Sequence, residues 1–172
     1  MQPSNLPVTL TWDLTRSGDT LHVAYHVHNT TSATVFLLDR LVVPDAQGLH
    51  AAFDRVIVRE GDTAGVVAFS RAYVRPERGT GGIYVPVAQR LEPGKTVDGE
   101  ADVPLPITAW HNFSKASPLQ ITPTHAYLEI GYLTEQDQWV QINLADGTQL
   151  SGPAHPFVDR QQLVRSDTRA IP

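Results

Sequence analysis

The sequence predicts a single all-β domain, an antiparallel β-sandwich of about 8–10 strands with one long proline-bounded loop. Three observations favour this class. Apolar and polar residues alternate over several short runs, 12 glycines and 13 prolines interrupt the chain, and no stretch shows the 3.6-residue apolar period of an amphipathic helix. Hydrophobic residues make up 41% of the 172 residues and charged residues 18%, which is typical of a chain that folds around a core.

The first two strands are predicted as a β-hairpin. Residues 8–14 carry an apolar side chain at every second position, which places these side chains on one face of a strand. Residues 16–19 (RSGD) predict a tight turn, and residues 21–28 then alternate again. In this second strand the odd positions are apolar and the even positions are His22, Ala24, His26 and His28. We therefore expect the histidines on the face opposite the core.

The rest of the sandwich is predicted from shorter runs. A third strand is expected at residues 34–43, where apolar residues occupy both faces, and residues 44–48 (PDAQG) are expected to end it. Further strands are expected at residues 55–59, 65–70, 82–87, 96–103, 126–134 and 139–144, the last two joined by a turn at residues 135–138. The expected inner face contains Leu10, Trp12, Val23, Tyr25, Leu128, Ile130 and Ile142.

Two segments fall outside the strand pattern. Residues 104–123 contain four prolines and form the long loop, and connections of more than about 12 residues without regular structure are often binding loops. Residues 1–153 are predicted as the sandwich and residues 154–172 as a C-terminal tail or a short helix, for which residues 159–165 are the candidate.

Two parts of the chain resemble bacterial immunoglobulin-like modules. Residues 21–38 (LHVAYHVHNTTSATVFLL) read as an alternating strand, an Asn-Thr-Thr turn and an apolar strand. Residues 90–95 (RLEPGK) are similar to the Leu-x-Pro-Gly turn that follows later in such modules. This order is found in the bacterial intracellular proteinase inhibitor family. The resemblance implies an immunoglobulin-like fold and, as an alternative function, protease inhibition by an exposed loop.

The histidine-bearing strand is the candidate metal site. Histidines two residues apart on a strand point the same way, so His22, His26 and His28 could share a Zn or Cu ion with a ligand from elsewhere. His26-Val27-His28 resembles the His-x-His strand motif of carbonic anhydrases and cupins. A further ligand would come from His50, His111, His125 or Asp39. The alternative is a solvent-facing strand on which alternate positions are simply polar.

The candidate binding residues lie in loops. Trp110, His111 and Phe113 lie in the proline-bounded loop, where aromatic side chains either cover the end of the core or contact a partner. Arg78 begins a glycine-rich loop (RGTGG) that could contact a partner. Glu100 and Asp102 share one face of a predicted strand, a pattern that usually marks a solvated surface.

Composition excludes several classes of function. The chain has no cysteine, which excludes disulfides, thiolate catalysis and cysteine-bound zinc. A net charge of -5 argues against nucleic-acid binding, which needs a concentrated basic surface. No apolar run approaches the length of a membrane span and no secretory signal is visible, so a cytoplasmic protein without membrane contact is expected.

No sequence pattern marks an enzyme, because the Gly-x-Ser-x-Gly nucleophile elbow is missing and no carboxylate pair stands out. The sequence favours a non-enzymatic, cofactor-free module that binds another protein, or a second copy of itself, through loops or edge strands. A metal-binding protein or metalloenzyme using the histidines, and a protease inhibitor, are the alternatives.

Overall fold

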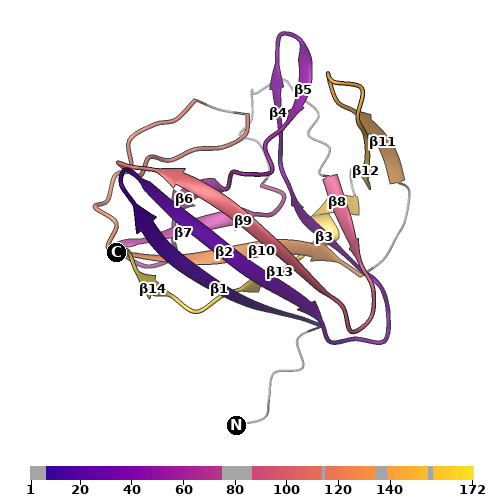
Figure 1. Cartoon of the computed structure of the whole chain (residues 1–172), viewed down its shortest axis with the longest axis horizontal. Helices are drawn as coiled ribbons and strands as arrows, with labels where there is room; N and C mark the ends of the chain where they lie inside the picture. Colours follow the sequence, from indigo (N-terminus) through magenta and orange to yellow (C-terminus); the bar gives the residue numbers. More distant parts are fainter. Residues whose placement is uncertain (1–6, 75–86, 114, 135–138, 155–156) are drawn as a thin grey trace.

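The computed structural model describes residues 7–74, 87–113, 115–134, 139–154 and 157–172, and these residues form an all-β chain (Figure 1). No helix in the described part is long and apolar enough to cross a membrane. The elements are β1 (Val8–Ser17), β2 (Thr20–Asn29), β3 (Val35–Arg40), β4 (Val42–Asp45), β5 (Gly48–Ala51), β6 (Ile57–Glu60), β7 (Val66–Arg71), β8 (Val87–Leu91), β9 (Thr96–Pro104), β10 (His125–Leu133), β11 (Trp139–Asn143), β12 (Gln149–Pro153), the 3-10 helix η1 (Phe157–Arg160), β13 (Gln162–Arg165) and β14 (Arg169–Ala170).

The first sheet contains three antiparallel strands in the order β1-β2-β9. β1 and β2 form the predicted hairpin, paired from Val8↔Asn29 to Ser17↔Thr20, with Gly18 at a φ of 57° in the turn. β9 pairs along the other side of β2, with His28 opposite Thr96 at one end and Thr20 opposite Pro104 at the other. Every even-numbered residue of β2 from 22 to 28 is therefore on the outer face of this sheet.

The second sheet contains seven strands and is not purely antiparallel. Its main order is β6-β7-β10-β3-β8, and β13 and β14 also pair with β10. β7 and β10 run parallel over six residue pairs, from His125↔Val66 to Ile130↔Arg71. The prediction of an antiparallel sandwich was wrong at this pair. Alternation within a strand defines its faces but not its neighbour, so the parallel pairing was not visible in the sequence.

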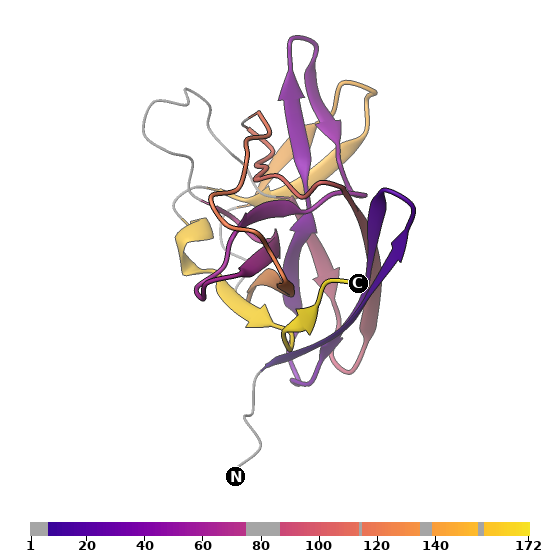
Figure 2. The same cartoon turned by 90° about the vertical axis from the view of Figure 1, so that its left-hand side faces the viewer.

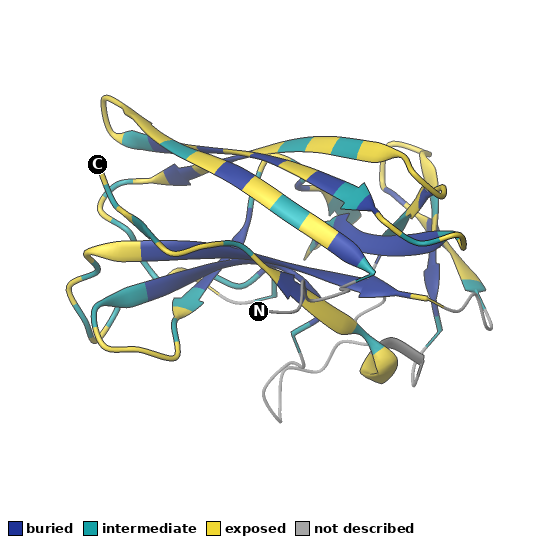
Figure 3. Cartoon of the chain, turned by 90° about the horizontal axis from the view of Figure 1, so that it is seen from below, coloured by how far each residue is buried: buried dark blue, intermediate teal, exposed yellow. Residues whose placement is uncertain are grey.

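The main hydrophobic core lies between the two sheets. Figure 3 shows β1, β2 and β9 above the larger sheet, with buried and exposed residues alternating along each of the three strands. The core combines buried side chains of both sheets, including Trp12, Tyr25, Phe69, Leu128 and Ile130. The predicted inner positions Leu10 and Val23 also pack there.

Ile142 was predicted for this inner face, and that prediction was wrong. It packs in a separate cluster with Val42, Val87 and Leu144, beside the two-stranded hairpins β4–β5 and β11–β12. Figure 2 shows these hairpins projecting together from one end of the molecule. Alternation places Ile142 on one face of β11, but only the tertiary structure determines which core that face contacts.

The predicted third strand is divided in two. β3 ends at Arg40 and β4 begins at Val42, and β4 continues through Pro44 because this residue lies in a two-stranded hairpin, opposite Leu49. The turn therefore follows Asp45, whose side chain accepts a hydrogen bond from the N–H of Gln47. The strand expected at residues 82–87 and the turn at residues 135–138 lie outside the described residues, except that β8 begins at Val87.

The C-terminal segment packs against the sandwich. After η1, β13 and β14 pair with β10, and Val164 is buried in the main core. The indole Nε1 of Trp12 donates to the carbonyl of Asp167 at 3.1 Å, and Arg169 forms a 2.6 Å ion pair with Asp13. These contacts hold the C-terminal segment beside β1.

Candidate functional site

The three histidines of β2 lie on the outer face of the three-stranded sheet, as predicted. Each one contacts the residue opposite it on β9. Nδ1 of His22 lies 2.6 Å from Oδ1 of Asp102, and Nδ1 of His26 lies 2.6 Å from Oδ1 of Asp98. His28 lies 3.2 Å from the hydroxyl of Thr96. The face is therefore a row of separate cross-strand pairs.

These pairs do not bring the histidines together around one point. Among the described residues, no group of three or more His, Cys, Asp or Glu side chains is arranged to hold a metal ion. Asp39, named as a further ligand, is buried between the sheets, whereas the histidines point to solvent. Binding of Zn or Cu by this strand stays a prediction.

The predicted binding loop adds to the edge of the larger sheet. Trp110 and Val58 of β6 exchange two backbone hydrogen bonds of 2.8 Å, and Ala109 pairs with Ser117 within the loop. Phe113 packs against the cluster of Phe36, Leu38, Tyr73 and Leu133. The loop is thus partly regular, and its aromatic side chains lie against the core.

In the sequence, His111 lies between Trp110 and Phe113. Its Nδ1 accepts a hydrogen bond from the N–H of Phe113 at 3.1 Å. Burial lowers the pKa of His111 below its ordinary value. Arg78 lies outside the described residues. Contact of a partner with Trp110, His111, Phe113 or Arg78 stays a prediction, as does protease inhibition by an exposed loop.

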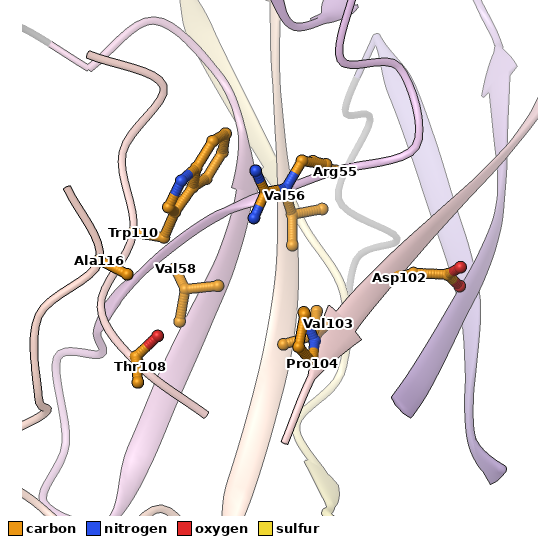
Figure 4. Close-up of a pocket in the computed structure, with 9 residues that line it drawn as sticks. All are labelled: Arg55, Val56, Val58, Asp102, Val103, Pro104, Thr108, Trp110 and Ala116. Atoms are coloured by element: carbon orange, nitrogen blue, oxygen red, sulfur yellow. The ribbon is translucent and has the colours of Figure 1, made fainter. Parts of the chain in front are cut away.

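Trp110 also borders a small pocket (Figure 4). The guanidinium of Arg55 lies 4.2 Å from the centre of a Trp110 ring, and Val58, Val103 and Pro104 form part of the wall. The pocket volume is about 50 Å³. Sites for small-molecule ligands usually measure about 300 Å³ or more, so this pocket is too small to be one.

The edge of β9 that faces away from β2 is the candidate interaction site. In an antiparallel strand, residues that direct N–H and C=O toward one neighbour alternate with residues that direct them to the other side. The even-numbered residues of β9 face away from β2, because the N–H of Asp102 donates to the carbonyl of Asp54 at 2.8 Å. No described segment outside β2 forms a hydrogen bond with the backbone of Thr96 or Asp98. Figure 1 shows β9 at the border of its sheet.

The open part of this edge has a defined end. The carbonyl of Glu100 accepts a 2.5 Å hydrogen bond from Nη2 of Arg71, and the N–H of Asp102 donates to the carbonyl of Asp54. Within the described parts of the chain, the outward groups without a backbone partner are thus the N–H and C=O of Thr96 and Asp98 and the N–H of Glu100. This length of backbone can accept one short extended segment.

Arg71 ends the open edge from a buried position in the core. Its side chain is 3% exposed, and Nη1 donates to the hydroxyl of Tyr25 at 2.6 Å. Its other donors reach main-chain carbonyls of the segment before β6, at Phe53 and Arg55. Arg71 therefore joins β7 to β2, to β9 and to this segment.

The Tyr25 hydroxyl in turn donates to Oδ2 of Asp39 at 3.2 Å. Burial raises the pKa of Tyr25, and the nearby Asp39 carboxylate raises it further. Burial also raises the pKa of Asp39, while the charge of Arg71 acts in the opposite direction. The three side chains form a buried polar network directly behind the open edge.

Gly99 lies opposite Tyr25, and the Tyr25 ring fills the space that a side chain at residue 99 would need. A Cβ at residue 99 would lie 2.1 Å from Cζ of Tyr25, so any larger residue would displace the ring. An open concavity of about 590 Å³ lies here. It is lined by residues 24–26 of β2, residues 98–100 of β9, Phe53 and Asp54.

The concavity and the open edge are acidic. Asp98 and Asp102 are 74% and 56% exposed, and Glu100 and Asp54 are exposed beside them. The shared face of Glu100 and Asp102 was predicted from the sequence as a solvated surface, and both residues are exposed. The sequence could not show which segments lie beside the backbone edge of this strand.

No protein-family model, no curated protein and no solved structure matches this chain. Its function therefore has to be inferred from the geometry of its own residues.

Proposed function

We propose that this chain is a non-enzymatic protein-interaction module of the immunoglobulin-like sandwich class, which binds an extended segment of another protein along β9. The observation that carries the proposal is the edge of β9 at Thr96, Asp98 and the N–H of Glu100, where no described segment forms a backbone hydrogen bond on the side away from β2. An edge strand with free N–H and C=O groups binds an extended peptide through main-chain hydrogen bonds.

β1, at the other edge of the same sheet, is less accessible. The C-terminal segment lies beside β1, with Trp12 bonded to Asp167 and Arg169 paired with Asp13. A segment approaching β1 would meet these groups. β9 has instead the concavity of Phe53 and Gly99 next to its free backbone groups.

Self-association through β9 is disfavoured by charge. Antiparallel pairing of two β9 edges that overlaps Asp98 or Glu100 with the same residues of the second copy places acidic side chains opposite each other, since Asp98, Glu100 and Asp102 occupy consecutive outward positions. Like charges directly opposite each other destabilise a strand pair. The favoured partner is a different protein.

Amide hydrogen exchange at single residues tests the proposal. In the free protein, the outward amides of Thr96, Asp98 and Glu100 should exchange quickly, and those of Val97, Gly99 and Ala101 slowly, because only the second set is bonded to β2. Addition of the neutral strand peptide Gly-Thr-Val-Thr-Val-Thr-Gly at millimolar concentration should slow the first set. Uniform protection along β9 in the free protein, or no change in the outward amides with the peptide, would contradict the proposal.

A further inference from the structure

The outer face next to the open edge of β9 has an excess of negative charge. Asp54, Asp98, Glu100 and Asp102 lie there, and the other outward side chains of the sheet are mainly threonine and histidine. Arg169, near β1, is bound by Asp13 and Asp167. Arg71 is buried and donates to main-chain carbonyls and to Tyr25. A strand that docks on β9 therefore meets the carboxylates of Asp98 and Glu100, and the described partner of Asp98 is the imidazole of His26.

The alternation of β9 defines which positions of a docked strand meet these charges. Side chains directly opposite each other on neighbouring strands have Cβ atoms about 5 Å apart. The residues opposite Asp98 and Glu100 are two apart in the docked strand and point to the same outer face. The residue between them points to the opposite face of the sheet, the face on which the Tyr25 ring packs over Gly99. Phe53 lines the concavity beside this part of the edge.

We propose that the segment bound along β9 is cationic, with two Lys or Arg side chains two residues apart that face Asp98 and Glu100, and an apolar side chain between them on the opposite face of the sheet. This inference rests on the proposed function, because it assumes that the segment docks as a strand. It specifies a short cation–apolar–cation motif, whose length is limited by Arg71 on the carbonyl of Glu100 and by Asp54 on the N–H of Asp102.

Three labelled peptides test the motif by fluorescence anisotropy with the full chain. They are Gly-Thr-Lys-Val-Lys-Thr-Gly, the same peptide with Glu in place of both Lys, and the same peptide with Thr in place of both Lys. We expect the Lys peptide to bind roughly tenfold more tightly than the Thr peptide and the Glu peptide to bind most weakly.

Two variants separate charge from strand addition. The double variant Asp98→Asn/Glu100→Gln keeps the shapes and the acceptor for His26 but removes both charges, and it should bind the Lys and Thr peptides about equally. Thr96→Pro removes one outward N–H at the first position of β9, without a bond to β2, and it should weaken the Lys and Thr peptides alike.

The outcomes distinguish the two proposals. Equal affinity of all three peptides for the unsubstituted protein, with loss of binding in Thr96→Pro, would overturn the cationic motif and leave strand addition standing. Selective binding of the Lys peptide that Thr96→Pro does not change would show attraction to a charged surface and overturn both. No binding of any peptide at millimolar concentration would also overturn both.

Discussion

β6 and β9 each lie at the border of a sheet, and they differ in whether their outer backbone groups are hydrogen-bonded. The outer backbone groups of Val58 in β6 are bonded to Trp110 from the proline-bounded loop. In the described residues, the corresponding groups of Thr96 and Asp98 in β9 have no such neighbour. An unpaired edge is a hazard for aggregation, and charged side chains are one way in which proteins limit it. Under our proposal, the carboxylates of the β9 edge oppose pairing between copies of this chain and favour a basic partner.

The proline-bounded loop is part of the folded sandwich and covers the edge of β6. The loop pairs with β6 through Trp110 and places Phe113 on a core cluster, so its described aromatic residues stabilise the sandwich. At the β9 edge, which carries no aromatic residue, no described segment beyond β2 forms a hydrogen bond with the backbone of Thr96 or Asp98. Binding of a partner by the aromatic residues of the loop stays a prediction, and the contacts described here give them a role within the sandwich.

The largest effect is expected for Arg71→Met, which removes the side chain that ends the open edge. The substitution leaves the Tyr25 hydroxyl and several carbonyl groups without their donor and the Asp39 carboxylate without the neighbouring charge. We expect the free energy of unfolding to fall by about 3–5 kcal/mol, measured by urea denaturation. Arg71→Lys should recover only part of this loss, since an ammonium cannot reproduce the guanidinium geometry. Full stability of Arg71→Met would show that the network does not hold β9 in place.

A pair of proline variants tests the contrast between the two edges directly. Trp110→Pro removes an N–H that donates to Val58, together with the packing of the indole, and should cost about 2–4 kcal/mol. Thr96→Pro removes an unpaired N–H and should cost less than about 1 kcal/mol. Trp110→Ala serves as the control that separates ring packing from the hydrogen bond. If Thr96→Pro unfolds the protein as readily as Trp110→Pro, the β9 edge is not open.

A smaller effect than that of Trp110→Pro is expected for Tyr25→Phe, which keeps the ring over Gly99 and removes the hydroxyl. Arg71 then loses its 2.6 Å acceptor and Asp39 loses a donor, which should cost about 1–3 kcal/mol. Tyr132→Phe is the matched control, because its hydroxyl donates to Gln162 in a half-buried contact and not to the Arg71–Asp39 network, and its removal should cost about 1 kcal/mol. Equal losses in thermal denaturation would mean that the Tyr25 hydroxyl has no special role behind β9.

The sequence predicted the local structure well where one face of a strand is buried and the other is solvated. The β1–β2 hairpin follows from strict alternation, and the outward position of the β2 histidines follows from the same pattern. Prediction was poorer at β3 and β4, which are apolar on both sides, because such a run does not show where one strand stops.

The sequence by itself determined the all-β class, the faces of the alternating strands and the acidic character of β9, because each depends on the order of neighbouring side chains. The tertiary structure decided the parallel β7–β10 pair, the separate cluster of Ile142 and the pairing of Trp110 with β6. It also decided that no described segment beyond β2 forms a hydrogen bond with the backbone of Thr96 or Asp98. These features depend on which segments meet across long stretches of chain, and a period-2 pattern defines the face of a strand without naming its neighbour.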